Sequence, residues 1–166
     1  ISQYLGNLDN YDVYERFTKT TTDFIDVFQQ RPTVVLVDKH PTYQSSLYGN
    51  SLAKEYKTAL FEIQHHKAHF ASVLGEHGLF EEEAVLGVIW DGTGYGDDGQ
   101  IWGGEFFKHE AKNIHRISHF SYFDWLAGDK MSKEPRLSFF SLSNSDQRSM
   151  IEDKFSREEL AIYEAL

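Results

Sequence analysis

Residues 84–107 read AVLGVIWDGTGYGDDGQIWGGEFF, and this stretch decides how the chain folds. The apolar run over residues 84–90 predicts a buried strand, and residues 101–107 predict a second strand. Between these runs, residues 91–106 carry six glycines in sixteen positions. Such a density is typical of a hairpin whose turns need left-handed backbone angles. The sequence therefore predicts two neighbouring strands joined by a glycine-rich loop.

Upstream of the hairpin, the pattern alternates between helices and strands. Apolar residues spaced by three and four predict an amphipathic helix over residues 11–29, which Pro32 ends. Two short apolar runs, residues 33–37 and 59–63, predict strands, the first of them buried and followed by Asp38. Two further helices are expected: residues 51–57, capped by Asn50, and residues 65–77, ended by Gly78.

Downstream, residues 113–120 predict another strand, and the polar stretch beyond Lys133 is typical of helices. Strand–helix alternation followed by a hairpin and a further strand indicates an α/β layer structure with a mixed sheet and flanking helices. The chain begins with Ile1 and closes on a helical stretch. We therefore expect it to be a piece of a longer protein.

Composition excludes several classes of function. The chain has no cysteine, which excludes disulfides and thiolate metal sites and makes a cytoplasmic location the expectation. Its 16 basic and 26 acidic residues give a net charge of −10, a field that repels nucleic-acid phosphates. No apolar run approaches the roughly 20 residues that a membrane helix needs. We expect no nucleic-acid partner and no membrane partner.

Three histidines fall within residues 64–70, QHHKAHF, where a helix is expected. His65 and His69 are four positions apart, so they share a helical face and can bind one metal ion. Helix-surface histidines also produce this spacing by chance. Asp91 strengthens the case, because it follows a buried strand at the end where α/β sheets bind ligands. Two histidines and one aspartate commonly bind Fe(II), Mn or Zn, with positions left open for a substrate.

A glycine-rich loop follows Asp91 and contains Gly92, Thr93, Gly94, Tyr95 and Gly96. Its exposed amides could cradle a phosphate, to which the Thr93 hydroxyl could also donate. The loop is neither a Walker loop nor a dinucleotide fingerprint, because no Gly-Lys-Ser/Thr follows it and a strand rather than a helix comes next. A plain hairpin is the alternative. Asp97 and Asp98 are expected only to solvate the turn.

Separated motifs along most of the chain resemble one known family, the HypF carbamoyltransferases of hydrogenase maturation. The motifs occur in the family's order: ISQYLGNL at residues 1–8, VDKHPTY at 37–43, QHHKAH at 64–69, DGTGYG at 91–96 with IWGGEF at 101–106, and GDKMSKEPR at 128–136. Residues 137–166 add little to the resemblance.

The resemblance implies an actin/Hsp70-like, ribonuclease-H-like ATPase fold, of which residues 1–166 would be the N-terminal part of the carbamoyl-transfer domain. In that family a neighbouring YrdC-like domain makes carbamoyl-adenylate from carbamoyl phosphate and ATP with Mg. The transfer domain then passes the carbamoyl group to the C-terminal cysteine thiol of the partner HypE. The product is the precursor of the cyanide ligands of nickel–iron hydrogenase. Residues 1–166 alone are expected to be inactive.

Carried over by motif position, the resemblance implies that His65, His69 and Asp91 bind a divalent, iron-like metal, with a fourth ligand beyond the chain's end. Gly92, Thr93, Gly94, Tyr95 and Gly96 would line the nucleotide phosphate site. Neither His66, Asp38 nor His40 receives a role. Two alternatives stay open: a small-molecule O-carbamoyltransferase of the same fold, and a non-enzymatic binding domain.

Three positions depart from the family's pattern. Lys67 stands where the family often has a histidine, Lys133 where arginine is usual, and Arg136 where a tryptophan commonly follows the Glu-Pro pair. These changes leave the metal ligands in place. They bear instead on the contacts to the acceptor and the nucleotide.

Overall fold

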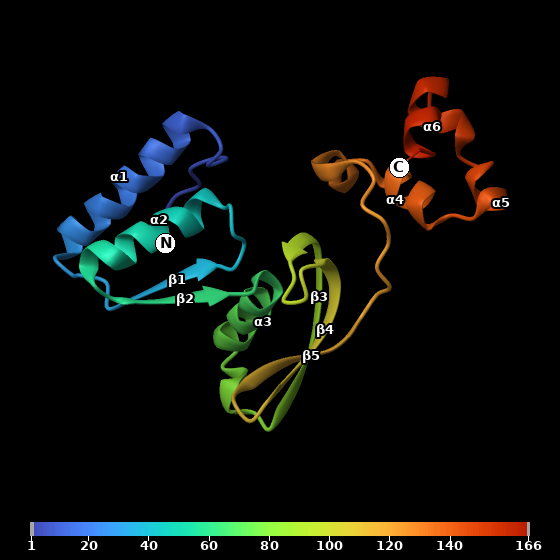
Figure 1. Cartoon of the computed structure of the whole chain (residues 1–166). Coiled ribbons are helices and arrows are strands. Elements are labelled where there is room, and N and C mark those ends of the chain that lie inside the picture. The colour runs from blue at the N-terminus through green and yellow to red at the C-terminus, as the bar shows by residue number, and fades with distance from the viewer. Residues whose placement is uncertain (1, 166) are drawn as a thin grey trace. The chain divides into compact units, whose positions relative to one another are not determined.

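The structure is a computed structural model that describes residues 2–165 (Figure 1). The chain divides into two compact units, the first ending at Ile117 and the second beginning at Ser118. Among the described residues, no helix has both the length and the apolar character that crossing a bilayer requires.

The first helix, α1 (Tyr11–Phe28), matches the predicted amphipathic helix. The Asn10 side chain accepts hydrogen bonds from two backbone amides of the first turn, and Gln29 ends the helix in the left-handed conformation. Aromatic contacts join α1 to the second helix, because the Phe17 ring packs edge-on against Tyr48 with centroids 5.3 Å apart. The N-terminal half of the apolar stripe therefore faces a neighbouring element, whereas Phe24 and Phe28 are 42% and 68% exposed.

The first sheet brings two strand ends together. β1 (Val34–Asp38) and β2 (Ala59–Ile63) pair in parallel, with Asp38 opposite Ile63. The connecting helix is α2 (Gln44–Tyr56), which packs on β1. Since the strands are parallel, their carboxyl ends lie at the same edge of the sheet.

The expectation that the β1 strand is buried on both faces is wrong. Val35 and Val37 face α2, where they pack against Gly49. Val34 and Leu36 point to the opposite face and are 47% and 64% exposed. The apolar run shows that both faces favour burial, but among the described residues a helix covers only one of them.

The predicted helix over residues 51–57 begins earlier than expected. α2 starts at Gln44, and Asn50 lies inside the helix, where its side-chain amide donates to the Ser46 carbonyl. A polar residue in mid-helix can satisfy its side chain in this way, so it resembles a cap in the sequence.

The second sheet is antiparallel, with strand order β3-β4-β5. The chain leads from β2 into α3 (His65–Glu76), as predicted, and then through the short η1 turn (Leu79–Glu81). The strands are β3 (Ala84–Tyr95), β4 (Ile101–Glu110) and β5 (Asn113–His119). Figure 1 shows α3 beside this sheet. The fold is thus α/β, and its parallel and antiparallel pairings belong to two sheets.

Packing of α3 against the second sheet forms the core of the first unit. Phe70 and Leu74 of α3 meet Trp102 and Phe107 of β4, and all four are buried. Gly87 lets the helix approach β3, because a Cβ there would lie 2.7 Å from the Phe70 ring. This contact fixes the helix that carries the histidines against the strand that carries Asp91.

β3 differs from its prediction in two ways. It runs through the first half of the glycine-rich loop, and its register with β4 is irregular between Trp90 and Gly94. The strand is also not buried, since Leu86, Val88 and Trp90 alternate on one face and are 64%, 49% and 70% exposed. Only the alternate face of β3 meets α3.

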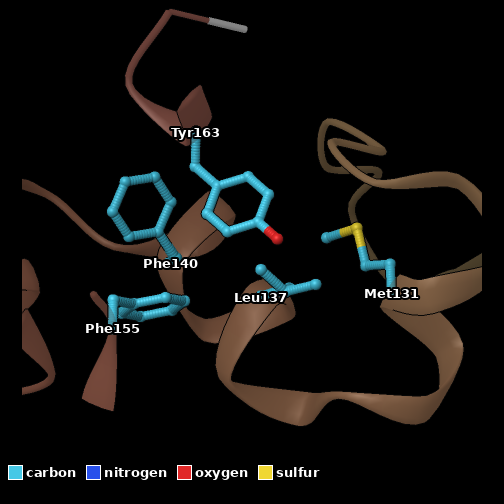
Figure 2. Packing of buried hydrophobic residues seen from close by; sticks show 5 residues of the cluster. All are labelled: Met131, Leu137, Phe140, Phe155 and Tyr163. Carbon is cyan, nitrogen blue, oxygen red and sulfur yellow. The ribbon is translucent and has the colours of Figure 1, made fainter. Parts of the chain in front are cut away.

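The second unit consists of short helices, as the sequence predicts. They are η2 (Gly128–Lys133), α4 (Pro135–Leu142), α5 (Ser145–Arg148), η3 (Glu152–Lys154) and α6 (Arg157–Tyr163). Figure 2 shows the buried cluster that holds them together: Met131, Leu137, Phe140, Phe155 and Tyr163. Three of its members are aromatic rings in edge-on or tilted contact. This small unit therefore has a core of its own.

Candidate metal centre and glycine loop

Two elements bring the predicted metal ligands together. His65 and His69 lie one turn apart on α3, and Asp91 lies on β3, against which α3 packs. One nitrogen from each histidine and one Asp91 carboxylate oxygen all lie within 4.8 Å of one another. The structure thus places the three side chains where the sequence predicted them.

The distances within this cluster fit a metal site. His65 Nε2 lies 2.9 Å from Asp91 Oδ2, His69 Nε2 lies 3.1 Å from His65 Nε2, and His69 Nε2 lies 3.4 Å from Asp91 Oδ2. Metal–ligand bonds of about 2.1 Å separate neighbouring ligand atoms by roughly 3.0 Å in an octahedral site and roughly 3.4 Å in a tetrahedral one. Two imidazoles and a carboxylate are also a usual donor set for Fe(II), Mn or Zn.

Asp91 is held in its ionised form. Its Oδ1 accepts the Gly92 amide at 2.7 Å, while its Oδ2 faces the histidines. Burial alone would raise the pKa of Asp91, but the Gly92 amide and the nearby His65 and His69 outweigh burial and lower the pKa below its ordinary value. The centre therefore offers a negative charge to any cation that binds there.

His66 lies apart from the three ligands, as expected from its position on the helix. Its side chain is fully buried, its Nδ1 lies 3.2 Å from the Gln64 amide nitrogen, and its ring packs under Gly94. Burial lowers the pKa of His66, so the ring is neutral at neutral pH. The buried His66 ring thus packs directly against Gly94 of the glycine loop.

The glycine loop has the hydrogen bonds and strand register of a β-hairpin. The Gly92 amide donates to Asp91, and the Gly96 amide donates to the Gln100 carbonyl at 2.9 Å. Gly94 and Tyr95 are in register with Trp102 and Ile101 of β4. Two of the amides expected to cradle phosphate are thus already engaged within the chain.

The expectation that Asp97 and Asp98 only solvate the turn is wrong. Asp97 accepts hydrogen bonds from the ammonium groups of Lys39 and Lys67. Asp98 accepts from the Trp102 indole at 2.8 Å and from Arg116 at 3.1 Å. Each carboxylate therefore fixes the hairpin to a different part of the first unit.

Asp38 is the residue whose part in the centre the sequence did not reveal. Its Oδ2 lies 2.8 Å from His65 Nδ1, on the side of the ring away from Asp91. One signal was available, because Asp38 ends β1 and His65 follows β2 within two residues. If β1 and β2 are taken as parallel neighbours, the two side chains belong at the same sheet edge.

The other residues left without a role lie outside the centre. The His40 ring stacks on Tyr43, with centroids 3.9 Å apart. In the second unit, Arg136 binds Glu134 and Glu159 and its guanidinium covers the Phe155 ring. Arg136 therefore stabilises its own unit.

The chain is an α/β domain in which two histidines and a carboxylate lie around one point, beside a glycine-rich hairpin. Comparison with known families narrows this description. The model described as "HypF Kae1-like domain" matches residues 1–76, and the model described as "Carbamoyltransferase, Kae1-like Domain, second subdomain" matches residues 87–165. The chain belongs to the HypF carbamoyltransferase family.

Curated relatives and solved structures agree with this assignment. Carbamoyltransferase HypF of Synechocystis sp. is 38% identical over 135 residues, which are 81% of this chain and 17% of that protein. Carbamoyltransferase HypF2 of Cupriavidus necator is 33% identical over 159 residues, 95% of this chain and 20% of that protein. The chain spans about a fifth of the length of these relatives.

Two crystal structures show the same fold. The structure of T. kodakarensis HypF superposes with a TM-score of 0.80 at 29% identity, covering 93% of this chain and 21% of that one. A full-length HypF in the phosphate- and nucleotide-bound form gives 0.79 at 32% identity, covering 98% and 21%. The fold is therefore a section of the actin/Hsp70-like ATPase type. The first family model ends with α3 and the second begins within β3, so the histidines fall in one matched region and Asp91 in the other.

Proposed function

We propose that the protein containing this chain transfers a carbamoyl group from carbamoyl-adenylate to the C-terminal cysteine thiol of a HypE-like partner. The product would be the precursor of the cyanide ligands of nickel–iron hydrogenase, made in the cytoplasm. This chain would supply the N-terminal part of the transfer domain. The single observation that carries the proposal is the cluster of His65, His69 and Asp91, whose ligand atoms lie 2.9–3.4 Å apart.

The chemistry of the substrate explains the need for such a cluster. Carbamoyl-adenylate is a mixed anhydride with a good leaving group, so catalysis mainly requires positioning and neutralisation of the departing phosphate. The chain has a net charge of −10, and its own field repels that phosphate. A divalent ion held by His65, His69 and Asp91 would supply a Lewis acid at this point.

The chain's own residues would do the rest. α3 and β3 hold the three ligands in place, because Phe70 of the helix packs against the sheet beside Gly87. The glycine loop from Gly92 to Gly96 follows Asp91 directly and would line the phosphate site. Thr93, which is partly buried, offers a hydroxyl there. ATP with Mg and carbamoyl phosphate would be used by another part of the full protein.

The proposal is tested by separating transfer from adenylate formation in the full-length protein. His69→Ala should remove the bound metal and abolish carbamoyl transfer to the acceptor thiol, read as the acceptor's mass. It should leave carbamoyl-phosphate-dependent adenylate formation intact. His77→Ala is the matched control, because His77 ends the same helix, is exposed and contributes its backbone amide to the cap.

Two outcomes would contradict the proposal. Transfer by His69→Ala at the normal rate without metal would show that the cluster takes no part. Transfer to a hydroxylated small molecule, with none to a protein thiol, would assign the rival O-carbamoyltransferase activity. Loss of adenylate formation together with transfer would indicate misfolding, which a His69→Gln variant and circular dichroism would check.

A further inference from the structure

The imidazole of His65 lies between two carboxylates. Its Nδ1 is 2.8 Å from Asp38 Oδ2, and its Nε2 is 2.9 Å from Asp91 Oδ2. Only Nε2 is also close to His69, whose Nε2 lies 3.1 Å away. Asp38 therefore contacts the side of the ring that faces away from the metal cluster, and its oxygens are not among the clustered ligand atoms.

The Asp38 carboxylate is itself fixed in position. Its Oδ1 accepts the His40 backbone amide at 2.8 Å, and its backbone carbonyl accepts the Ser46 hydroxyl at 2.7 Å. Asp38 is the last residue of β1 and pairs with Ile63 of β2. The side chain is only 20% exposed. Both oxygens are thus committed, one to the turn that follows β1 and one to His65.

These contacts decide which nitrogen of His65 can bind a cation. An ionised carboxylate only accepts hydrogen bonds, so Asp38 requires a proton on His65 Nδ1. The neutral ring then carries its lone pair on Nε2, which faces Asp91 and His69. A lone pair 2.9 Å from a carboxylate oxygen needs a positive centre between them. That centre is either a proton on Nε2, which makes the ring an imidazolium, or a metal ion that takes the place of this proton.

We infer that Asp38 is a positioning residue of the metal centre: it fixes the Nδ1–H tautomer and the ring orientation of His65, and so makes Nε2 the ligand atom. This inference rests on the proposed function, because it assumes that the cluster binds a metal. A carboxylate behind a metal-binding imidazole also increases the basicity of the ligand nitrogen. His69, which is more exposed, has no such carboxylate among the described residues.

Asparagine is an informative replacement for Asp38. Its side chain has one oxygen, whereas the aspartate uses one oxygen for the His40 amide and the other for His65. If the Asn oxygen serves His40, its NH₂ group faces His65 Nδ1 and forces the proton onto Nε2. If the oxygen serves His65, the NH₂ group opposes the His40 amide. Asp38→Asn should therefore weaken metal binding almost as much as Asp38→Ala.

The experiment measures the Zn²⁺ affinity of the metal-free full-length protein by chelator competition. The His69→Ala variant gives the background binding of Zn²⁺ at other sites. Asp38→Asn and Asp38→Ala should bind Zn²⁺ about 10- to 100-fold more weakly than the unaltered protein. Glu62→Gln is the matched control, because it removes one exposed carboxylate from β2 beside the partner of Asp38 without contact to His65. It should change the affinity less than about twofold.

A second measurement needs no variant. In ¹⁵N-histidine NMR of the Zn²⁺-loaded protein, His65 should show a protonated Nδ1 and a coordinated Nε2. Coordination through Nδ1 would overturn the inference, as would Asp38 variants that bind Zn²⁺ as tightly as Glu62→Gln. If saturating Co²⁺ gives Asp38→Asn a different coordination number, Asp38 is a ligand and the inference is also wrong. Failure of the unaltered protein to bind any ion above background would instead overturn the proposed function.

Discussion

The Lys67 ammonium lies 2.7 Å from the Asp97 carboxylate, although 30 residues separate them in the chain. Lys67 stands between His65 and His69 on α3, while Asp97 is at the tip of the β3–β4 hairpin. The second oxygen of Asp97 accepts the Lys39 ammonium, which follows β1. One carboxylate thus connects the helix of the metal centre, the glycine loop and the first sheet. We call these three residues the Asp97 clamp.

Removing the Asp97 clamp should loosen the glycine loop. Asp97→Asn is expected to lower the free energy of unfolding by about 1 kcal/mol, because two ion pairs that are about one-third exposed contribute a few tenths to 1 kcal/mol each. Hydrogen exchange should accelerate at the amides of residues 93–99. Asp23→Asn, which breaks an exposed helical pair with Lys19, should cost less and leave the loop unaffected. Equal loop protection in both variants would contradict the clamp.

The same clamp has a defined pH dependence. Burial alone would raise the pKa of Asp97, but the hydrogen bonds from Lys39 and Lys67 outweigh it and lower the pKa below the ordinary value of 3.8. A depressed carboxylate pKa gives stability that is fully present above pH 3.8 and is lost as pH falls through the lower folded-state value. The stability difference between the unaltered protein and Asp97→Asn should stay constant above about pH 5 and shrink in stronger acid. Denaturant titrations at several pH values measure it. A difference that grows on acidification would be inconsistent with this cause.

Two neighbouring glycines should respond differently to an added methyl group. A Cβ on Gly94 would lie 2.5 Å from the buried His66 ring, whereas a Cβ on Gly92 would meet nothing within 4 Å. Gly94→Ala is therefore expected to cost about 1–3 kcal/mol through overpacking, while Gly92→Ala should be neutral or stabilise by a few tenths of a kcal/mol. Thermal and urea unfolding of the two variants check this. Equal costs would show that His66 does not support the loop.

Much of the fold was predictable because its signals are local. The three-and-four spacing around Phe17 marked α1, and the short β-branched run around Val35 marked β1. Burial was harder to predict. An apolar residue such as Leu36 shows that a strand face favours burial, but not that another element of this chain packs on that face. The start of α2 was missed for a related reason. Asn50 resembles a cap in sequence, and only its bond to the Ser46 carbonyl shows that the helix has already begun.

Some residues of the candidate site were likewise predictable from local sequence patterns, and others were not. The shared helical face of His65 and His69 was predictable from their spacing. Asp91 was identified from the apolar run that precedes it, although it lies within β3 and not after it. Asp38 and Asp97 were not, because each acts through a residue at least 27 positions away in the chain. Such pairings depend on strand register and on how the hairpin folds over α3. They therefore follow from the tertiary structure and carry no local pattern.

The chain of residues 1–166 alone should bind ATP poorly, because several of its candidate groups for phosphate already have partners. The Gly92 and Gly96 amides have partners, and the ammonium groups of both lysines of the Asp97 clamp are paired with Asp97. Asp97→Asn would remove one negative charge and free both lysines. It should tighten ATP binding by roughly fivefold, the effect of about 1 kcal/mol between unit charges at 4 Å in water. Calorimetry on both chains, after circular dichroism confirms folding, measures the change. Micromolar affinity of the unaltered chain, or weaker binding by Asp97→Asn, would show that phosphate does not compete with Asp97 for these lysines.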